Sequence, residues 1–495
     1  MIRNHEQDVL ILDEEFKEDT HRTKKQAKKK KPRNKEFVRV TYFFVALFLT
    51  MMGYIVYFNA IKSKEIINNP HNVRLDSMAD RVVRGKILDN VGNILAETHV
   101  SEQGEETRSY PYGEIYAHVV GYDSNGKSGV ESIANFDLLT SNAFFFERIS
   151  NEIQEKKNIG DDIVTTLDTE LQTTAYNALG KFKGAVVVME ASTGKILSMV
   201  SKPSFNPNTV IEDWNWLISD ENSTLLNRAT QGAYAPGSVF KLVTTLAYMR
   251  DNENYEKYSY TCESKITHEG VTIHCAGNRR HGEENLADSL ANSCNASYSN
   301  IGLSLNMKSY QDTAEDLLFN SKLPNLLPYS KSKFNLTNDS TSAEIMMTAI
   351  GQGKTQVSPY HMALISAAIA NGGTLMKPYL VDQIVNHTGT AISKNYPGKY
   401  TQLMTSNEAA KLKEYMTGVI EYGTGTALNN ENYTVAGKTG TAEYSSDKSK
   451  SHSWFTGFSN VDNPEIVVSV VVESADNTGM SAVSVAKKVF DAYYY

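Results

Sequence analysis

One apolar segment near the N-terminus constrains this chain more than any other feature. Residues 40–60 contain no charged side chain, and about 20 such residues suffice for a helix to cross the hydrocarbon core of a membrane. Its tyrosines suit the aromatic enrichment near membrane interfaces. The apolar run is longer than the roughly 7 to 15 residues of the apolar h-region of a signal peptide, and residues 59–62 offer no obvious small-x-small cleavage site. We therefore predict a retained transmembrane helix at residues 40–61.

Basic residues crowd residues 22–39, although the whole chain carries a net charge of -8. A lysine run by itself could bind nucleic acid, but here it directly precedes the apolar segment. Basic residues flank transmembrane helices on the cytoplasmic side. We therefore expect a cytoplasmic N-terminus, no nucleic-acid partner, and a single-pass membrane protein whose residues from about 62 onward lie outside the cell membrane. Residues 1–39 are too polar to bury a core and are predicted to be a disordered basic tail.

The rest of the 495 residues is long enough for two or three folded units. Residues 62–160 contain short strand-like runs, at 82–88 and 94–98, separated by Asp-Asn and Gly-Asn turn signals. This pattern predicts a small, strand-rich pedestal. Residues 161–495 have longer patterned elements and are predicted to form the main domain.

The main domain reads as α+β. A helix is expected at 169–182, and strands at 183–190 and 196–200 flank a Thr-Gly turn, as in an antiparallel hairpin. The C-terminal end adds predicted strands at 453–458 and 465–473 and a helix at 482–494. Residues 242–423 are mostly helical in pattern. We expect an antiparallel sheet flanked by helices, together with a helical subdomain.

The first of three short motifs is S-x-x-K, formed by Ser238 and Lys241 after a Pro-Gly turn and before an apolar helical stretch. Three-residue spacing on a helix stacks the two side chains on one face. A serine becomes a useful nucleophile when a neighbouring base removes its proton, and a lysine held neutral by burial is such a base. The motif alone also fits any solvated helix surface.

The second motif is Ser293-Cys294-Asn295, in a stretch of small and polar residues that reads as a loop. A hydroxyl group there could relay a proton, and an amide could pair with a peptide through its donor and its acceptor. A polar turn without function is the simpler interpretation of this motif alone.

The third motif is Lys438-Thr439-Gly440, followed by Thr441, at the expected start of a strand beside residues 453–458. The glycine lets a ligand approach the backbone. A lysine and two hydroxyls could hold a carboxylate, and the Thr441 N–H could donate to an oxyanion together with that of Ser238. Alone, the motif also fits a solvated lysine in a turn.

The order S-x-x-K, S-x-N, K-T-G beyond one membrane segment resembles class B penicillin-binding proteins. The resemblance continues in the pedestal, at residues 84–89, 108–111 and 129–131, and at 202–207 and 351–353 of the main domain. It implies the penicillin-binding transpeptidase fold and a serine-type D-Ala-D-Ala transpeptidase that β-lactams inhibit. Residues 62–160 are too short for the glycosyltransferase domain of class A members.

The resemblance also implies individual roles. Ser238 would be the acylated nucleophile, Lys241 its base and Ser293 the proton relay to the leaving D-alanine. Asn295 would hold the donor peptide. The terminal carboxylate and the scissile carbonyl would be bound by Lys438, Thr439, Gly440 and Thr441. No metal or organic cofactor is implied. The implied partners are peptidoglycan stem peptides and a membrane glycan polymerase of the SEDS type.

Other interpretations stay open. Serine β-lactamases and β-lactam sensors share the motifs, but the pedestal argues against the first and the single membrane segment against the second. A D,D-carboxypeptidase would use water in place of an amine. A non-catalytic scaffold of the wall-synthesis machinery would be expected to lose a motif, and all three are intact.

The three cysteines raise a separate question. Cys262 and Cys275 are close enough in sequence for a disulfide. A zinc-binding module is an alternative, since His268, His274 and His281 lie nearby, but their spacing matches no familiar zinc motif. Ordinary thiols are the third possibility, and the sequence assigns no chemistry to Cys294.

Overall fold

The computed structural model describes residues 35–62, 78–325, 327–444, 450–475 and 479–495. The chain divides into two units, Met1–Lys64 and Glu65–Tyr495. The described part of the first is helix α1 (Lys35–Tyr57) followed by the π-helical turn η1 (Phe58–Lys62). Among the described residues, α1 alone is long and apolar enough to cross a membrane, with a mean hydropathy of 1.8.

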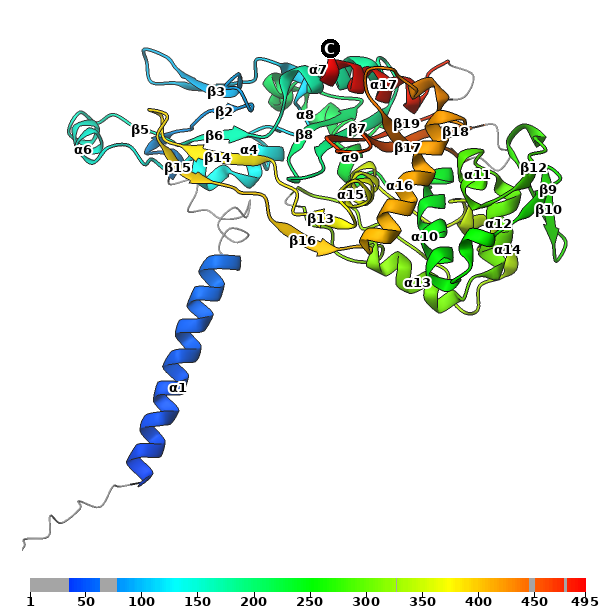
Figure 1. The fold of residues 1–495 in the computed structure, drawn as a ribbon. Coiled ribbons are helices and arrows are strands. Elements are labelled where there is room, and N and C mark those ends of the chain that lie inside the picture. Colours follow the sequence, from blue (N-terminus) through cyan, green and yellow to red (C-terminus); the bar gives the residue numbers. More distant parts are fainter. Residues whose placement is uncertain (1–34, 63–77, 326, 445–449, 476–478) are drawn as a thin grey trace, which may run out of the picture. The chain divides into compact units, whose positions relative to one another are not determined.

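Helix α1 starts earlier than the predicted transmembrane segment. Lys35 to Arg39 were assigned to the disordered tail, yet they form the first turn of α1 (Figure 1). No proline or glycine interrupts these residues, so the helix extends past the apolar boundary. Residues 1–34 of the predicted tail lie outside the described residues.

The second unit contains a mixed six-stranded sheet in the order β15-β14-β6-β2-β3-β4. Its strands are β2 (Ile87–Leu88), β3 (Ile94–Val100), β4 (Glu106–Ser109), β6 (Asp162–Thr165), β14 (Val381–Val385) and β15 (Ala391–Lys394). The predicted run at 94–98 lies within β3, which is antiparallel to β2, and is confirmed. The predicted run at 82–88 divides into two short strands, Val82–Val83 and β2, which belong to different sheets. The sheet also takes two strands from residues 381–394, which the sequence did not indicate.

The remaining elements of the N-terminal region surround this sheet. They are a short parallel pair, β1 (Val82–Val83) and β5 (Asn158–Ile159), with helices α4 (Gly129–Ile133), α5 (Asn135–Leu138) and α6 (Phe145–Ile153).

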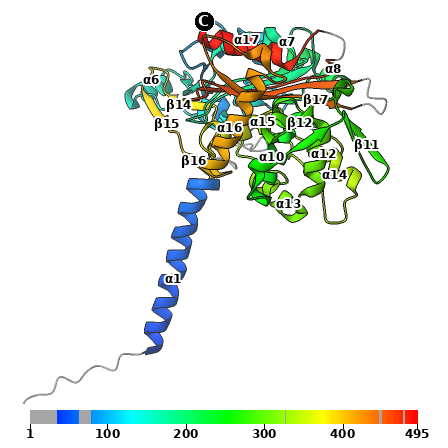
Figure 2. The same cartoon turned by 45° about the vertical axis from the view of Figure 1, so that its right-hand side comes forward.

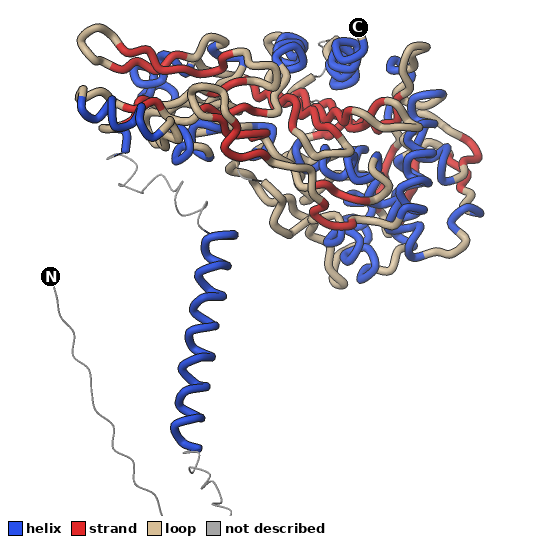
Figure 3. Tube along the Cα trace, turned by 60° about the vertical axis from the view of Figure 1, so that its left-hand side comes forward, coloured by secondary structure: helices blue, strands red, loops and turns tan. Residues whose placement is uncertain are grey.

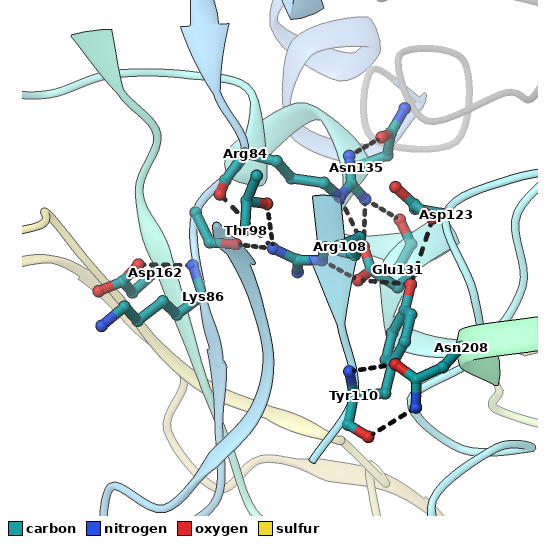
Figure 4. Close-up of polar contacts among 11 residues, drawn as sticks. Arg84, Lys86, Thr98, Arg108, Tyr110, Asp123, Glu131, Asn135, Asp162 and Asn208 are labelled. Atoms are coloured by element: carbon teal, nitrogen blue, oxygen red, sulfur yellow. Dashed lines mark hydrogen bonds and ion pairs between the residues drawn. The ribbon is translucent and has the colours of Figure 1, made fainter. Parts of the chain in front are cut away.

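A buried ion network ties these elements together (Figure 4). The carboxylate of Glu131, on α4, is fully buried and accepts from Arg84 Nε at 2.6 Å and from Arg108 Nε at 2.8 Å. Arg84 also donates to Asn135 Oδ1 at 2.5 Å, and Tyr110 donates to Glu131 at 3.3 Å. The network joins β4 to α4 and α5 in a region whose strands are too short to build a large apolar core.

A five-stranded antiparallel sheet, in the order β17-β18-β19-β7-β8, is the centre of the main domain. Its strands are β7 (Gly184–Glu190), β8 (Ile196–Lys202), β17 (Val435–Glu443), β18 (Ser451–Ser459) and β19 (Ile466–Val472). All seven residues of β19 are buried, as expected for a strand covered on both faces. The predicted hairpin and both C-terminal strands are confirmed.

Helices cover both faces of this sheet (Figures 1 and 3). On one face lie α7 (Thr169–Leu179) and α17 (Ala482–Tyr494), which were predicted at 169–182 and 482–494. On the other lies α15 (Pro359–Ala370), in which every residue is buried. This arrangement confirms the predicted α+β class.

The helical subdomain lies beyond α15. Its helices are α10 (Lys241–Asp251), α11 (Leu286–Ala291), α12 (Asn295–Ser304), α13 (Met307–Asp316), α14 (Ser342–Ala349) and α16 (Ser406–Glu421). Short helices α8 (Val210–Leu217) and α9 (Arg228–Gln231) precede it.

The mostly helical region 242–423 also contains short hairpins that were not predicted. Their strands are β9 (Tyr260–Cys262), β10 (Lys265–His268), β11 (Val271–His274), β12 (Gly282–Glu284), β13 (Thr374–Met376) and β16 (Lys399–Gln402). Between β10 and β11, Glu269 and Gly270 have φ values of 45° and 78°. Two consecutive left-handed residues form the turn that matches strand twist, so this hairpin closes tightly.

Candidate active site

Ser238 lies in a 3-10 turn, η4 (Gly237–Phe240), that runs directly into α10. A 3-10 helix has three residues per turn, so Ser238 and Lys241 share one face. Gly237 has a φ of 56°, and a Cβ atom there would lie 2.3 Å from the carbonyl oxygen of Thr441. Only a glycine therefore lets this turn pack against β17. This packing brings the first motif next to the third.

Lys241 joins the first motif to the second. Its side chain is fully buried, and Nζ donates to Ser293 O at 2.7 Å, Ser293 Oγ at 3.2 Å and Asn295 Oδ1 at 2.8 Å. Burial lowers the pKa of Lys241 to about 8, although the nearby thiol groups oppose the shift. The amine thus titrates close to neutral pH while it contacts both polar residues of the S-x-N motif.

The S-x-N motif spans a turn and a helix start. Ser293 occupies the turn between α11 and α12 with a φ of 56°, whereas Asn295 is the first residue of α12. The loop expected for this stretch ends early, because Cys294 Sγ caps α12 by accepting from Ser297 N at 3.4 Å. Asn295 Nδ2 donates to His274 O at 3.0 Å, so the amide links α10 to the β11 hairpin.

The K-T-G motif lies in the middle of β17, at the edge of the five-stranded sheet, and not at a strand start. Lys438 is fully buried and its amine donates to Thr439 O at 2.9 Å. The hydroxyl of Thr439 bonds to that of Thr424 at 2.6 Å, and Thr441 is exposed. Thr439 and Thr441 are two residues apart on the strand, so their side chains lie on one face of β17.

Gly440 completes the contact between the two motifs. A Cβ atom at this position would lie 3.1 Å from Val239 Cγ1 and 3.2 Å from Val239 N. The absence of a side chain lets the β17 backbone approach the residue that follows Ser238. Burial, and next the positive charge of Lys241, hold the pKa of Lys438 well below its usual range. Two buried amines therefore influence each other at the junction of the three motifs.

A cluster of metal-ligating side chains lies beside this junction. Cys262, Cys275, His281 and Cys294 bring one ligand atom each to within 4.8 Å of one another. Cys262 and Cys275 are free thiols with their sulfur atoms 3.6 Å apart, so the disulfide considered from the sequence is not formed. Sequence reasoning missed Cys294, which enters the cluster only through the packing of α12.

Comparisons with known proteins show the family to which the chain belongs. The family model described as penicillin binding protein transpeptidase domain matches residues 184–494. A second, described as penicillin binding protein A dimerisation domain, matches residues 84–163. The chain is 29% identical over 429 residues to the peptidoglycan D,D-transpeptidase PbpA of Mycolicibacterium smegmatis, covering 82% of this chain and 87% of the relative.

Solved structures show the same similarity. The D,D-transpeptidase domain of a peptidoglycan glycosyltransferase from Eggerthella lenta has a TM-score of 0.74 at 30% identity and covers 83% of this chain and 98% of that one. Penicillin-binding protein A from M. tuberculosis, as an imipenem acyl-enzyme complex, has a TM-score of 0.75 at 28% identity, with 83% and 99% covered. The chain therefore belongs to the penicillin-binding protein transpeptidase family, as a class B member with an N-terminal dimerisation-type domain.

Proposed function

We propose that this protein is a serine-type peptidoglycan D,D-transpeptidase, a target of β-lactams, that acts through an acyl-enzyme on Ser238. The observation that carries the proposal is the convergence of three motifs on one buried amine. Lys241 Nζ contacts Ser293 and Asn295, and the turn that bears Ser238 packs on β17 next to the K-T-G residues.

In this mechanism Lys241 takes the proton of Ser238 as its hydroxyl attacks the carbonyl carbon of the penultimate D-alanine. The lowered pKa of Lys241 favours the neutral amine that a base requires. Ser293, 3.2 Å from Lys241 Nζ, passes the proton to the departing amine of the terminal D-alanine. Asn295 holds the donor peptide through its amide.

In this mechanism the K-T-G strand binds the negatively charged groups of the substrate and of the transition state. The N–H groups of Ser238 and Thr441 donate to the developing oxyanion. Lys438, Thr439 and Thr441 bind the terminal carboxylate, and Gly440 leaves room for the peptide. Because β17 is an edge strand, its outer backbone groups are suited to pair with an extended stem peptide.

The ester on Ser238 is then attacked by an amine from a neighbouring stem peptide, which forms the cross-link and frees the serine. A β-lactam acylates Ser238 in the first half as its ring C–N bond breaks, but the expelled nitrogen stays tethered to the acyl group. It therefore does not leave the site to the acceptor amine, and the second half stalls. Support comes from the relative in M. tuberculosis, whose structures are described as acyl-enzyme complexes with imipenem, ceftriaxone and penicillin G. The acyl transfer itself requires no metal or organic cofactor.

We further propose a single-pass topology with α1 in the cell membrane, the N-terminus in the cytoplasm and the catalytic domain outside. The apolar α1 and the preceding lysines support this orientation. For the domains we keep a span at 40–61, a pedestal at 62–160 and a transpeptidase domain at 161–495, and the tail that precedes α1 is assigned to the cytoplasm. A membrane glycan polymerase of the SEDS type would supply the glycan strands.

The test uses the full-length protein in detergent, labelled with a fluorescent penicillin and followed by intact mass. We expect a long-lived adduct in the wild type, no adduct in Ser238→Ala, and normal labelling in the matched control Ser304→Ala, an exposed serine at the end of α12. Absence of a Ser238-dependent adduct would contradict the proposal and favour the scaffold. Rapid release of hydrolysed drug would indicate a β-lactamase.

A second measurement separates transpeptidation from carboxypeptidation. A D-Ala-D-Ala peptide is supplied with and without an amine acceptor, and products are identified by mass. A cross-linked product supports the transpeptidase. Release of D-alanine with water as the sole acceptor would support the carboxypeptidase instead.

A further inference from the structure

Four side chains from separate elements meet beside the S-x-N motif. Cys262 ends β9, Cys275 follows β11, His281 precedes β12 and Cys294 caps α12. All three cysteines are at most 2% exposed and His281 is half-buried. Figures 1 and 2 show these hairpins against α12 at the far end of the helical subdomain.

Three distances among these ligand atoms match edges of one tetrahedron, and all four atoms lie within 4.8 Å of one another. Zinc bonds to sulfur at about 2.3 Å and to imidazole nitrogen at about 2.0–2.1 Å, so a tetrahedral site places two sulfurs about 3.8 Å apart, and a sulfur and a nitrogen about 3.6 Å apart. Here Cys262 Sγ lies 3.6 Å from Cys275 Sγ and 3.4 Å from His281 Nδ1. Cys275 Sγ lies 3.7 Å from Cys294 Sγ.

Other uses of the same groups explain less. A disulfide has a bond of about 2.05 Å, which these pairs exceed by more than about 1.5 Å, and it would leave the third buried thiol and the imidazole without a purpose. Thiols are weak hydrogen-bond partners, so three thiols and one imidazole gain little free energy from hydrogen bonds when they are buried together.

Few side chains of the surrounding hairpins are fully buried. Between residues 260 and 284 the buried residues are Cys262, Ile273, Cys275 and Glu284. Two of these four are cysteines, and a single aliphatic side chain is no core. Small units of this kind need a staple, and a metal is one of the few available.

We propose that Cys262, Cys275, His281 and Cys294 bind one zinc ion, and that this ion positions Ser293 and Asn295. Four protein ligands fill a tetrahedral site, so the ion is structural and takes no substrate. Binding displaces the protons of three thiols, and neutral His281 coordinates through Nδ1. The three thiolates and Zn²⁺ leave one negative charge, which the N-terminus of α12 favours at Cys294. Thiolate ligands select zinc over magnesium or calcium.

The link to the catalytic residues is covalent and short. Cys294 separates Ser293 from Asn295, the two residues that Lys241 Nζ contacts. Asn295 Nδ2 also donates to His274 O, which directly precedes the ligand Cys275. The ion therefore fixes the backbone next to Asn295 through Cys294, and it fixes the carbonyl group that accepts from the Asn295 amide through Cys275. This positioning role rests on the proposed function, whereas the metal site itself does not.

The metal is tested on full-length protein purified under reducing conditions from medium containing zinc. We expect about one zinc per chain by elemental analysis, and loss of zinc in His281→Gln and Cys275→Ser. The matched control His268→Gln removes an exposed imidazole from the same hairpins and should keep the metal. Co²⁺ loaded into the wild type gives a second readout that does not depend on the folding of the variants: the absorption of a tetrahedral thiolate complex. Wild-type protein with no zinc, or with a Cys262–Cys275 disulfide by mass, would overturn the site.

Positioning is tested by removing zinc from the wild type with a chelator and measuring the rate of fluorescent-penicillin labelling. Small displacements of reacting groups cost on the order of 10- to 100-fold in rate, so we expect a loss of that size that added Zn²⁺ restores. An unchanged rate in zinc-free protein would refute the positioning role. Zinc-loaded protein that never labels would refute the proposed function and leave the metal site in place.

Discussion

Glu131 should be the most sensitive single carboxylate of the pedestal. Its side chain is fully buried, and it is the acceptor shared by Arg84 and Arg108, whose side chains are 8% and 5% exposed (Figure 4). In Glu131→Gln the volume stays nearly the same, but the amide turns a donor toward one guanidinium and the charge disappears. Two buried cations then lack a counterion.

Removing one partner of a buried ion pair costs about 3–5 kcal/mol. Because one carboxylate serves two arginines here, we expect about 4 kcal/mol, which corresponds to an opening equilibrium about 10³-fold larger. The matched control is Glu106→Gln, which breaks a pair with Lys157 whose side chains are 26% and 38% exposed. Exposed pairs contribute about 1 kcal/mol or less.

Hydrogen exchange measured by mass spectrometry on the full-length protein is the assay, since it reports local opening in a chain of several parts. Peptides covering β4 and α4 should exchange about 10³-fold faster in Glu131→Gln at neutral pH. Similar, small effects of Glu131→Gln and Glu106→Gln would refute the reasoning.

The pH dependence supplies a second check on Glu131. Burial opposes its ionisation, but Arg108 and Arg84 outweigh burial and lower its pKa. A carboxylate with a depressed folded-state pKa contributes stability that is fully present above its unfolded pKa of about 4.3. That contribution is lost as the pH falls through the lower folded-state pKa, so the difference between wild type and Glu131→Gln should persist at pH 5–8 and shrink only below about pH 4.

Three further predictions concern the active site and its support. Burial lowers the pKa of Lys241 to about 8, so the rate of acylation by penicillin should rise about tenfold from pH 7 to a plateau above pH 9, where the base is neutral. A labelling rate that stays constant over this range in stopped-flow measurements would contradict the role of Lys241. Gly351→Ala should abolish labelling, since its Cβ would lie 1.9 Å from Gly237 O. The control Gly353→Ala has a similar φ and its nearest neighbour at 3.7 Å, so it should retain labelling. Equal labelling of the two variants would count against a steric cause. Glu473→Gln removes the negative charge that pairs with Arg228 at 2.8 Å and should lower the free energy of unfolding by about 2 kcal/mol in urea denaturation, and an unchanged denaturation midpoint would show that this ion pair does not matter.

Local patterns in the sequence predicted much of the framework. The continuous apolar centre of β7, the Thr-Gly turn before β8 and the apolar run of β19 depend on neighbours along the chain, so the assignments of these strands agree with the structure. The three motifs were visible for the same reason, because each combines a few adjacent residues with a distinct chemistry.

Contacts between distant segments had no local signal. The pedestal sheet accepts β14 and β15 from residues 381–394, more than 200 residues after β6. Likewise, the spacing of Cys262, Cys275 and His281 resembles no familiar zinc motif, and Cys294 joins them only because α12 packs against the hairpins.

The sequence by itself determined the main strands and helices, the candidate membrane segment and the three motifs, since backbone periodicity and side-chain chemistry are properties of short stretches. Only the tertiary structure decided that Lys241 contacts Ser293 and Asn295, that Lys438 is fully buried within β17, and that three cysteines and a histidine meet within 4.8 Å of one another. These are distances across the fold, and they depend on how whole helices and strands pack, which no local pattern encodes.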